Sequence, residues 1–141
     1  MQIILHGKPA PHPRPRATVF VGSVRMYSPK TKWRTAIEEQ LKLHKEDPLT
    51  GPLKVRLHFR IPRPKAHYRG NPENGVLRDD APERPTAQRI GDLDNLSKAV
   101  LDAMNGIVFV DDSQVVHLSS MKTYASDASL AGCAANIFPL K

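Results

Sequence analysis

The feature that most constrains the fold is a strict alternation of apolar and polar residues over positions 53–61. The odd positions, from Leu53 to Ile61, are all apolar, and the even positions are all basic. These even positions are Lys54, Arg56, His58 and Arg60. Because successive side chains of a strand point to opposite faces, the pattern predicts a β-strand that is buried on one side and basic on the other.

Periodicity elsewhere predicts the remaining elements. Strands are expected at 1–7, 107–110, 114–124 and 130–138, a hairpin at 17–27, and helices from Ser28 to about Glu46 and from about Asp94 to Asn105-Gly106. Ser28 would be the N-cap of the first helix and Pro29 its first residue. We therefore predict a mixed α/β (α+β) fold, in which two main helices pack on one face of a largely antiparallel sheet.

The chain has 141 residues, which predicts a single domain over 1–141. Residues 62–91 lack periodicity and are rich in Pro, Gly, Asn and charge, so we expect a long mobile loop, of the kind that is often functional. The single cysteine, Cys133, lies in an apolar run and is expected in the core. We see no membrane-spanning run and no signal-peptide pattern, so the predicted location is a reducing cytoplasm.

The net charge of +7 is unevenly distributed along the chain. Residues 1–69 carry an excess of 11 positive charges, and residues 70–141 carry an excess of 4 negative charges. A basic half beside an acidic cluster suits a protein that binds a polyanion on one surface and cuts it with a metal at another. The alternative is a basic soluble protein with scattered, solvated charges.

The acidic cluster lies in residues 91–112, GDLDNLSKAVLDAMNGIVFVDD. Asp92 and Asp94 are two residues apart before a helical pattern, Lys98 follows one turn later, and the pair Asp111-Asp112 follows a short apolar run. Carboxylates in extended backbone two residues apart point the same way and would hold Mg²⁺ against a phosphate. The alternatives are helix capping by Asp92, a polar turn at the second pair, and a simple ion pair for Lys98.

These residues resemble the RusA-type Holliday-junction resolvases. The resemblance is carried by DLDNLSKAVLDAMNG, then DDSQVV, then Lys122, and more weakly by GKPAPHPRPR and YSPKT near the start. Residues 62–91 resemble an insertion in phage and prophage members of the family. The resemblance implies a homodimer whose two active sites nick opposed strands of four-way or other branched DNA, in recombination and repair.

The resemblance also implies roles for individual residues. Asp92, Asp94 and Asp112 would bind Mg²⁺, or Mn²⁺, and Lys98 would contact the scissile phosphate or stabilise charge in the transition state. Asp111 and Lys122 would contact these residues without binding the metal, and Asp111 is also an alternative ligand. Asp102 is expected to pair with Lys98 rather than to bind metal. Gln114 could either bind a ligand carboxylate or face solvent.

Candidate DNA-binding residues are basic side chains outside the acidic cluster, which would contact phosphates without reading sequence. They are Arg14, Arg16, Lys30, Lys32, Arg34, Arg56 and Arg60. For any one of them the alternative is a solvated basic face. Trp33 and Tyr27 are expected in the core rather than in base stacking.

Two rival functions remain at this point. One is a nuclease for other branched DNA, and the other is a non-catalytic protein that binds DNA junctions and uses the carboxylates only structurally. A nucleotide-binding enzyme is disfavoured because the sequence has no glycine-rich phosphate loop, and no nucleotide cofactor is expected.

Overall fold

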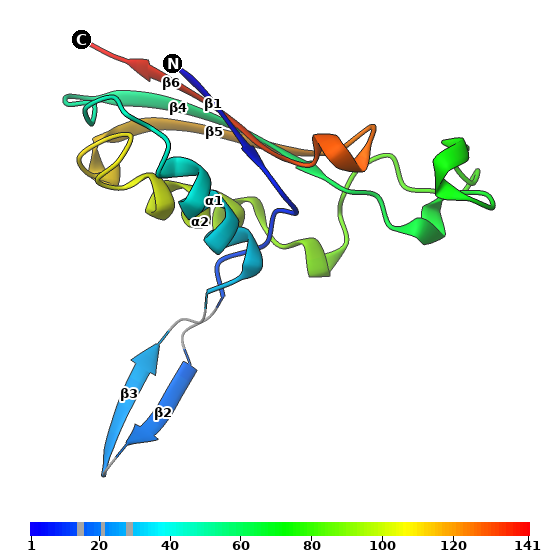
Figure 1. Ribbon diagram of the computed structural model, residues 1–141, viewed down its shortest axis with the longest axis horizontal. Helices are drawn as coiled ribbons and strands as arrows, with labels where there is room; N and C mark the ends of the chain where they lie inside the picture. The colour runs from blue at the N-terminus through cyan, green and yellow to red at the C-terminus, as the bar shows by residue number, and fades with distance from the viewer. Residues whose placement is uncertain (14–15, 21, 28–29) are drawn as a thin grey trace.

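The computed structural model describes residues 1–13, 16–20, 22–27 and 30–141, and only the backbone at residues 16, 18, 20, 25 and 27. Its centre is a four-stranded sheet with the order β1-β6-β4-β5 (Figure 1). The strands are β1 (Gln2–His6), β4 (Leu53–Ile61), β5 (Val115–Tyr124) and β6 (Gly132–Pro139). β6 pairs antiparallel with β1 and β4, and β5 pairs parallel with β4. The prediction of a mixed, largely antiparallel sheet is confirmed.

Two helices, α1 (Lys32–Leu41) and α2 (Leu93–Met104), cover one face of this sheet, as predicted (Figure 1). The odd positions of β4 are all buried against them, because the alternation places every apolar side chain on that face. Trp33 is 2% exposed and belongs to this core, whereas the side chain of Tyr27 lies outside the described residues. Cys133 is also buried, and burial raises the pKa of its thiol to about 12, which suits a core residue.

The predicted bounds of α1 were wrong at its C-terminal end. Thr31 is the N-cap, and its Oγ1 accepts a hydrogen bond of 3.0 Å from the backbone N–H of Arg34. Ser28 and Pro29, the predicted start, lie outside the described residues. The helix ends at Leu41 instead of Glu46, because the next apolar side chain, Leu43, is exposed and adds nothing to the buried face.

Residues 107–110, predicted as a strand, form a compact turn instead. Val108 and Phe109 are buried, and the backbone here bonds to the end of α2 and to Leu49. The Leu49 N–H donates to Val108 O at 2.9 Å, and Leu49 O accepts from Val110 N–H at 3.3 Å. Gly106 adopts a φ of 76°, which lets the chain turn directly after α2. The four apolar residues therefore belong to a partly buried turn and not to a sheet strand.

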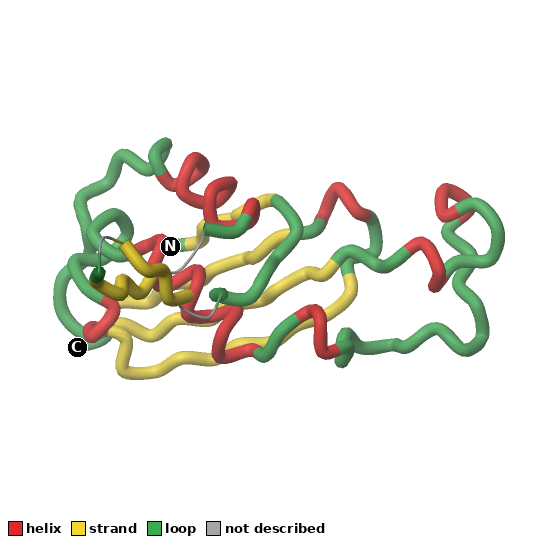
Figure 2. The backbone as a smooth tube through the Cα atoms, turned by 90° about the horizontal axis from the view of Figure 1, so that it is seen from below, coloured by secondary structure: helices red, strands yellow, loops and turns green. Residues whose placement is uncertain are grey.

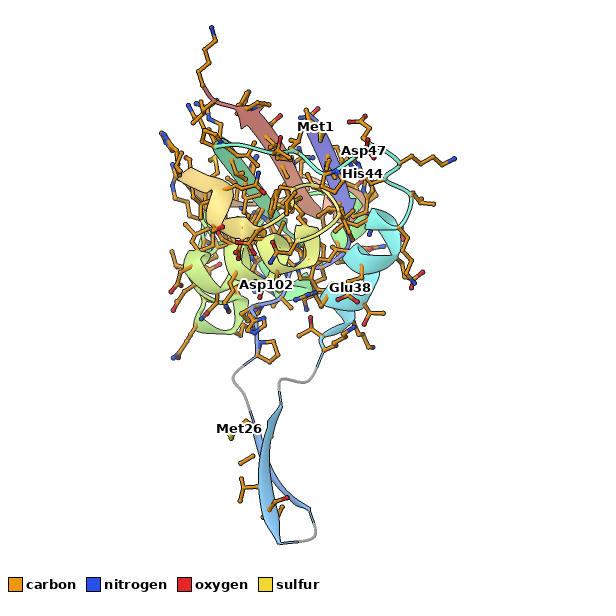
Figure 3. All side chains as sticks on the ribbon, turned by 90° about the vertical axis from the view of Figure 1, so that its left-hand side faces the viewer. Met1, Met26, Glu38, His44, Asp47 and Asp102 are labelled. Carbon is orange, nitrogen blue, oxygen red and sulfur yellow. The ribbon has the colours of Figure 1, made fainter. Side chains whose placement is uncertain are left out.

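The predicted hairpin is confirmed as β2 (Arg16–Phe20) paired with β3 (Ser23–Tyr27). It stands away from the body of the molecule (Figures 1 and 3). Three of its apolar side chains, Val19, Val24 and Met26, are at least 65% exposed.

Residues 62–91 are more regular than the expected structureless loop. They contain three short 3₁₀ helices, η1 (Lys65–His67), η2 (Pro72–Asn74) and η3 (Gln88–Ile90), and extend past the end of the sheet (Figure 2). Arg63 anchors the segment, because its guanidinium lies 4.2 Å from the Tyr124 ring centre and donates a 2.7 Å hydrogen bond to Pro82 O.

Among the helices of the described residues, none combines the length and the apolar character needed to cross a membrane.

Candidate metal and DNA-binding site

The N-terminus of α2 presents two carboxylates that have no partner in the described part of the chain. Asp92 occupies the N-cap position with extended backbone, but its side chain makes no capping hydrogen bond. Asp94 lies in the first turn, and both side chains are exposed. The capping alternative for Asp92 is therefore not realised as a hydrogen bond. Both charges lie at the positive end of the helix dipole, which favours anionic groups there.

We predicted that Asp92 and Asp94 point the same way because both have extended backbone, and this holds for only one of them. Asp92 has extended backbone, as expected, but Asp94 is the second residue of the helix. The period of two that applies to a strand therefore does not hold across the pair. Asp94 instead shares a helix face with Lys98, four residues further on.

The backbone in front of Asp92 is held from two sides. Gly91 has a φ of 96°, and a Cβ at this position would lie 2.7 Å from the Cβ of Pro11. Only glycine fits both the conformation and the close approach. On the other side, Lys122 Nζ of β5 donates a 2.9 Å hydrogen bond to Gly91 O. The half-buried Lys122 therefore lies behind the site, where it positions the residue before Asp92.

Lys98 lies one turn beyond Asp94 with its side chain 58% exposed. Its Nζ is 3.8 Å from Asp102 Oδ2, an i,i+4 ion pair that agrees with the predicted role of Asp102. The separation is longer than a hydrogen bond, and exposed pairs of this kind contribute little to stability. The ammonium can therefore leave Asp102 for a phosphate at small cost.

The two carboxylates of the second acidic pair differ, because Asp111 is hydrogen-bonded within the described part of the chain and Asp112 is not. Asp111 Oδ2 accepts a 2.9 Å hydrogen bond from Ser113 N–H and caps the 3₁₀ helix η4 (Asp112–Gln114). Hydrogen bonds from the hydroxyl and backbone N–H of Ser113 hold the pKa of Asp111 below its ordinary value. The carboxylate of Asp112, by contrast, makes no hydrogen bond or ion pair with any described residue.

Gln114 has a structural role that neither prediction for it anticipated. Its Oε1 accepts from Asp111 N–H at 2.8 Å, which completes a capping box, and its Nε2 donates at 2.9 Å to the carbonyl oxygens of Leu49 and Gly51. These bonds tie the turn to the segment before β4. Gln114 thus fixes the backbone around Asp112.

Asp112 and the α2 pair lie at opposite ends of the helix within one chain. Lys122 contacts Gly91 before the helix, and Ser120 Oγ lies 2.7 Å from Ser97 Oγ within it, so β5 runs antiparallel to α2. Lys122 lies seven residues after Val115 along β5, a span of about 23 Å at about 3.3 Å per residue, and Asp112 precedes Val115 in η4. Consistently, His, Cys, Asp and Glu side chains of the described residues form no group of three or more that could hold a metal.

One chain therefore supplies two carboxylates at one end of α2 and one at the other. Mg²⁺ is commonly held by one or two carboxylates, with water and substrate phosphates completing its shell. The unpartnered oxygens of Asp92 and Asp94 fit that requirement in kind and number. Ligation by Asp92, Asp94 and Asp112 remains a prediction.

Among the described residues, the predicted DNA-binding side chains come from two separate elements, the start of α1 and β4. Lys30 and Arg34 both pair with Glu38, at 3.0 and 2.8 Å, and these contacts lower the pKa of Glu38. Arg56 and Arg60 lie on the face of β4 that is turned away from the helices. Arg14 and the side chain of Arg16 lie outside the described residues.

Lys32 is the predicted basic residue that borders a groove next to the α2 N-terminus. Four further cations that the sequence analysis missed share this border, namely Lys8, Arg63, Lys65 and Arg89. Each stands as a single charge among prolines or loop residues, so no run of basic residues marks them. The one available signal is the basic-proline alternation of GKPAP and PRPK.

Comparisons with known proteins show the family of this chain. The family model for endodeoxyribonuclease RusA matches residues 6–131. The uncharacterized protein YqaN of Bacillus subtilis (strain 168) is 31% identical over 135 residues, which cover 90% of this chain and 89% of that protein. The chain therefore belongs to the RusA endodeoxyribonuclease family. Membership implies the class of endonuclease that resolves Holliday junctions and binds branched DNA.

Proposed function

We propose that this chain is a Mg²⁺-dependent endonuclease that resolves four-way DNA junctions by paired, symmetric phosphodiester hydrolysis. It would act as a homodimer in DNA recombination and repair, in the cytoplasm of a bacterial or phage-infected cell. The observation that carries the proposal is the pair Asp92 and Asp94, whose exposed carboxylates lack partners among the described residues at the positive end of α2. Mn²⁺ is the alternative metal, because it accepts the same oxygen ligands.

The proposed chemistry assigns a task to each residue at this end of the helix. Asp92 and Asp94 would hold the metal, which when bound activates a water and stabilises the charge of the phosphate. Lys98 would bring its ammonium to a phosphate oxygen as negative charge grows there. Lys122 and Pro11 would keep the backbone before Asp92 fixed, so that the first carboxylate does not have to be ordered when DNA binds.

The position of Asp112 supports a site that is shared between two subunits. Because Asp112 lies at the far end of α2, it cannot join Asp92 and Asp94 of its own chain. A two-fold dimer relates each surface to the same surface of the other copy, so Asp112 of the partner subunit can complete the acidic triad. Two equivalent sites formed in this way would cut two strands symmetrically.

The test is cleavage of a labelled synthetic four-way junction and of a matched linear duplex, with and without Mg²⁺. We expect paired nicks in the junction only, with Mg²⁺ required and with ends that a ligase can seal. Cleavage of the duplex at the same rate, or cleavage in the presence of EDTA, would contradict the proposal.

A second candidate is a protein that binds junctions without cutting them. It is favoured by the absence, within the described part of a single chain, of three acidic, imidazole or thiolate side chains arranged for a metal. The same experiment separates the two functions. Tight junction binding with no cleavage under Mg²⁺ or Mn²⁺ would establish the binding protein.

A further inference from the structure

We propose that the groove beside the α2 N-terminus is a binding site for a single-stranded segment of DNA, which it leads to Asp92 and Asp94. The groove has a volume of about 780 Å³. Its walls come from residues 8–11, the start of α1, residues 61–65 and residues 89–90. This inference deepens the proposed function and rests on it for the cutting step, but not for the binding step.

The floor of the groove is apolar and suits the faces of unpaired bases. We call floor the less exposed apolar lining, namely the half-buried Pro11, Pro62, Pro64 and Ile90 and the buried Trp33. In a duplex the base faces are stacked and hidden, whereas in a single strand they are free to contact an apolar surface. An apolar floor of this kind therefore favours single-stranded over duplex DNA.

The rim of the groove is cationic and suits phosphates. Five basic side chains line it, and no acidic residue does so among the described residues. Of these five, Lys8, Lys32, Lys65 and Arg89 make no side-chain hydrogen bond or ion pair within the described part of the chain. Arg63 differs, because its bond to Pro82 O and its contact with Tyr124 make it a fixed part of the wall.

The groove is adjacent to the candidate metal site along the backbone. Ile90 directly precedes Gly91, and Pro11 of the floor fills the space next to Gly91 where a Cβ would stand. A strand that lies along the rim would therefore reach the carboxylate of Asp92 with its backbone. Several cations around one groove also fit several phosphates of one strand better than a single free nucleotide.

The experiment measures binding by fluorescence anisotropy with the full chain in EDTA, so that no cleavage occurs. The probes are an eight-nucleotide oligothymidylate, an abasic oligonucleotide with the same number of phosphates, an eight-base-pair duplex and dTMP. We expect the oligothymidylate to bind at least about tenfold more tightly than the abasic strand, because each base that packs on the apolar floor removes apolar surface from water. The duplex and dTMP should bind more weakly still.

Variants locate this binding in the groove. Lys32→Gln with Arg89→Gln should weaken oligothymidylate binding about tenfold or more and lower the magnitude of the salt slope by about 1.4, since each single-strand phosphate contact contributes about 0.7. The control is Lys45→Gln with Lys141→Gln, which removes the same charge from exposed positions outside the groove. The control should leave affinity and slope unchanged, and circular dichroism should show that both double variants are folded.

Three results would overturn the proposal. These are equal affinity for the abasic and base-bearing strands, an equal loss of affinity in the control variant, and competition by an acidic peptide such as oligoglutamate as strong as that by DNA. Cleavage is measured separately, on junctions with Mg²⁺. Base-dependent binding without cleavage would contradict the proposed nuclease function and support the single-strand site in the groove. Junction cleavage without base-dependent binding would support the nuclease function and contradict the single-strand site.

Discussion

The two acidic pairs of this chain look alike in sequence but differ in what their carboxylates do. At the N-terminus of α2, both Asp92 and Asp94 lack partners among the described residues. At η4, Asp111 is used as a cap, and only Asp112 stays without a partner in the described part of the chain. The local backbone explains the difference. The N-terminus of η4 is capped by the Asp111 carboxylate, whereas the N-terminus of α2 has no side-chain cap among the described residues.

The comparison separates ligand candidates from structural acids. A carboxylate that already accepts from a backbone N–H has lost part of its capacity to bind a metal, and removal of its charge also removes a turn contact. At α2 the backbone before Asp92 is held by Lys122 and Pro11 and not by the aspartate side chains. The carboxylates of Asp92 and Asp94 are therefore available to bind a ligand.

The largest expected effect tests the unpartnered carboxylates of α2. Asp94→Asn should lower junction cleavage by at least about 10³-fold, because it removes a charged metal ligand while it keeps the shape of the side chain. Junction binding in EDTA should change little. The matched control is Asp79→Asn, at an exposed position in the 62–91 segment, which should cleave like the wild type. Equal loss in the two variants would contradict a metal-binding role for Asp94.

A mixing experiment tests whether the two ends of α2 work together across subunits. In a mixed dimer of Asp94→Asn and Asp112→Asn chains, a shared-site arrangement leaves one site intact and puts both changes in the other. Random mixing should then restore about a quarter of the wild-type nicking rate, since about half of the dimers are mixed and each has one of two sites. No recovery on mixing would place all the ligands of a site in one chain.

The next largest effect is expected from the hydrogen bond of Lys122 to the residue before Asp92. Lys122→Met should raise the Mg²⁺ concentration needed for half-maximal cleavage by about 10- to 100-fold, because Gly91 O loses the group that positions it. Junction affinity in EDTA should stay constant, which a general loss of structure would not allow. Lys122→Arg keeps a donor and should recover part of the metal affinity. An unchanged Mg²⁺ midpoint in Lys122→Met would show that the hydrogen bond is unimportant for the site.

The smallest effect concerns the cap at η4. Asp111→Ala should lower the Tm at pH 7 by a few degrees, with Mg²⁺-dependent cleavage retained, because it removes a capping acceptor and no proposed ligand. Since the folded pKa of Asp111 is lowered, its contribution to stability is present above the ordinary pKa of an aspartate and is lost as the pH falls through the folded value. The wild type and Asp111→Ala should therefore converge in Tm toward pH 2, and a constant difference from pH 7 to pH 2 would contradict this account.

Much of the fold follows from local pattern. The alternation at 53–61 and the stripe of α2 each determine a buried face, and both elements have their predicted character. The short run at 107–110 failed as a strand because four apolar residues fit a buried turn equally well. The extra turn predicted after Leu41 was wrong because helical spacing does not show which apolar residues find a partner.

The sequence identified candidate residues for the site but not how they are arranged. The residues from Asp92 to Lys98 lie together as expected, because they share one helix start. The distance from Asp112 to that start depends on the direction of β5 beside α2, which is a tertiary property. The groove cations were missed for the same reason, since Lys8 and Arg89 are distant in sequence and meet only in the fold.

The measurement that tests the central claim most directly compares adjacent aspartates, Asp111→Asn and Asp112→Asn, on a four-way junction with a Mg²⁺ titration. Our account predicts that Asp112→Asn loses cleavage but still binds the junction. Asp111→Asn, which keeps a capping oxygen, should cut at close to the wild-type rate. Loss of cleavage in Asp111→Asn with full activity in Asp112→Asn would contradict the assignment of the unpartnered carboxylates as the metal ligands.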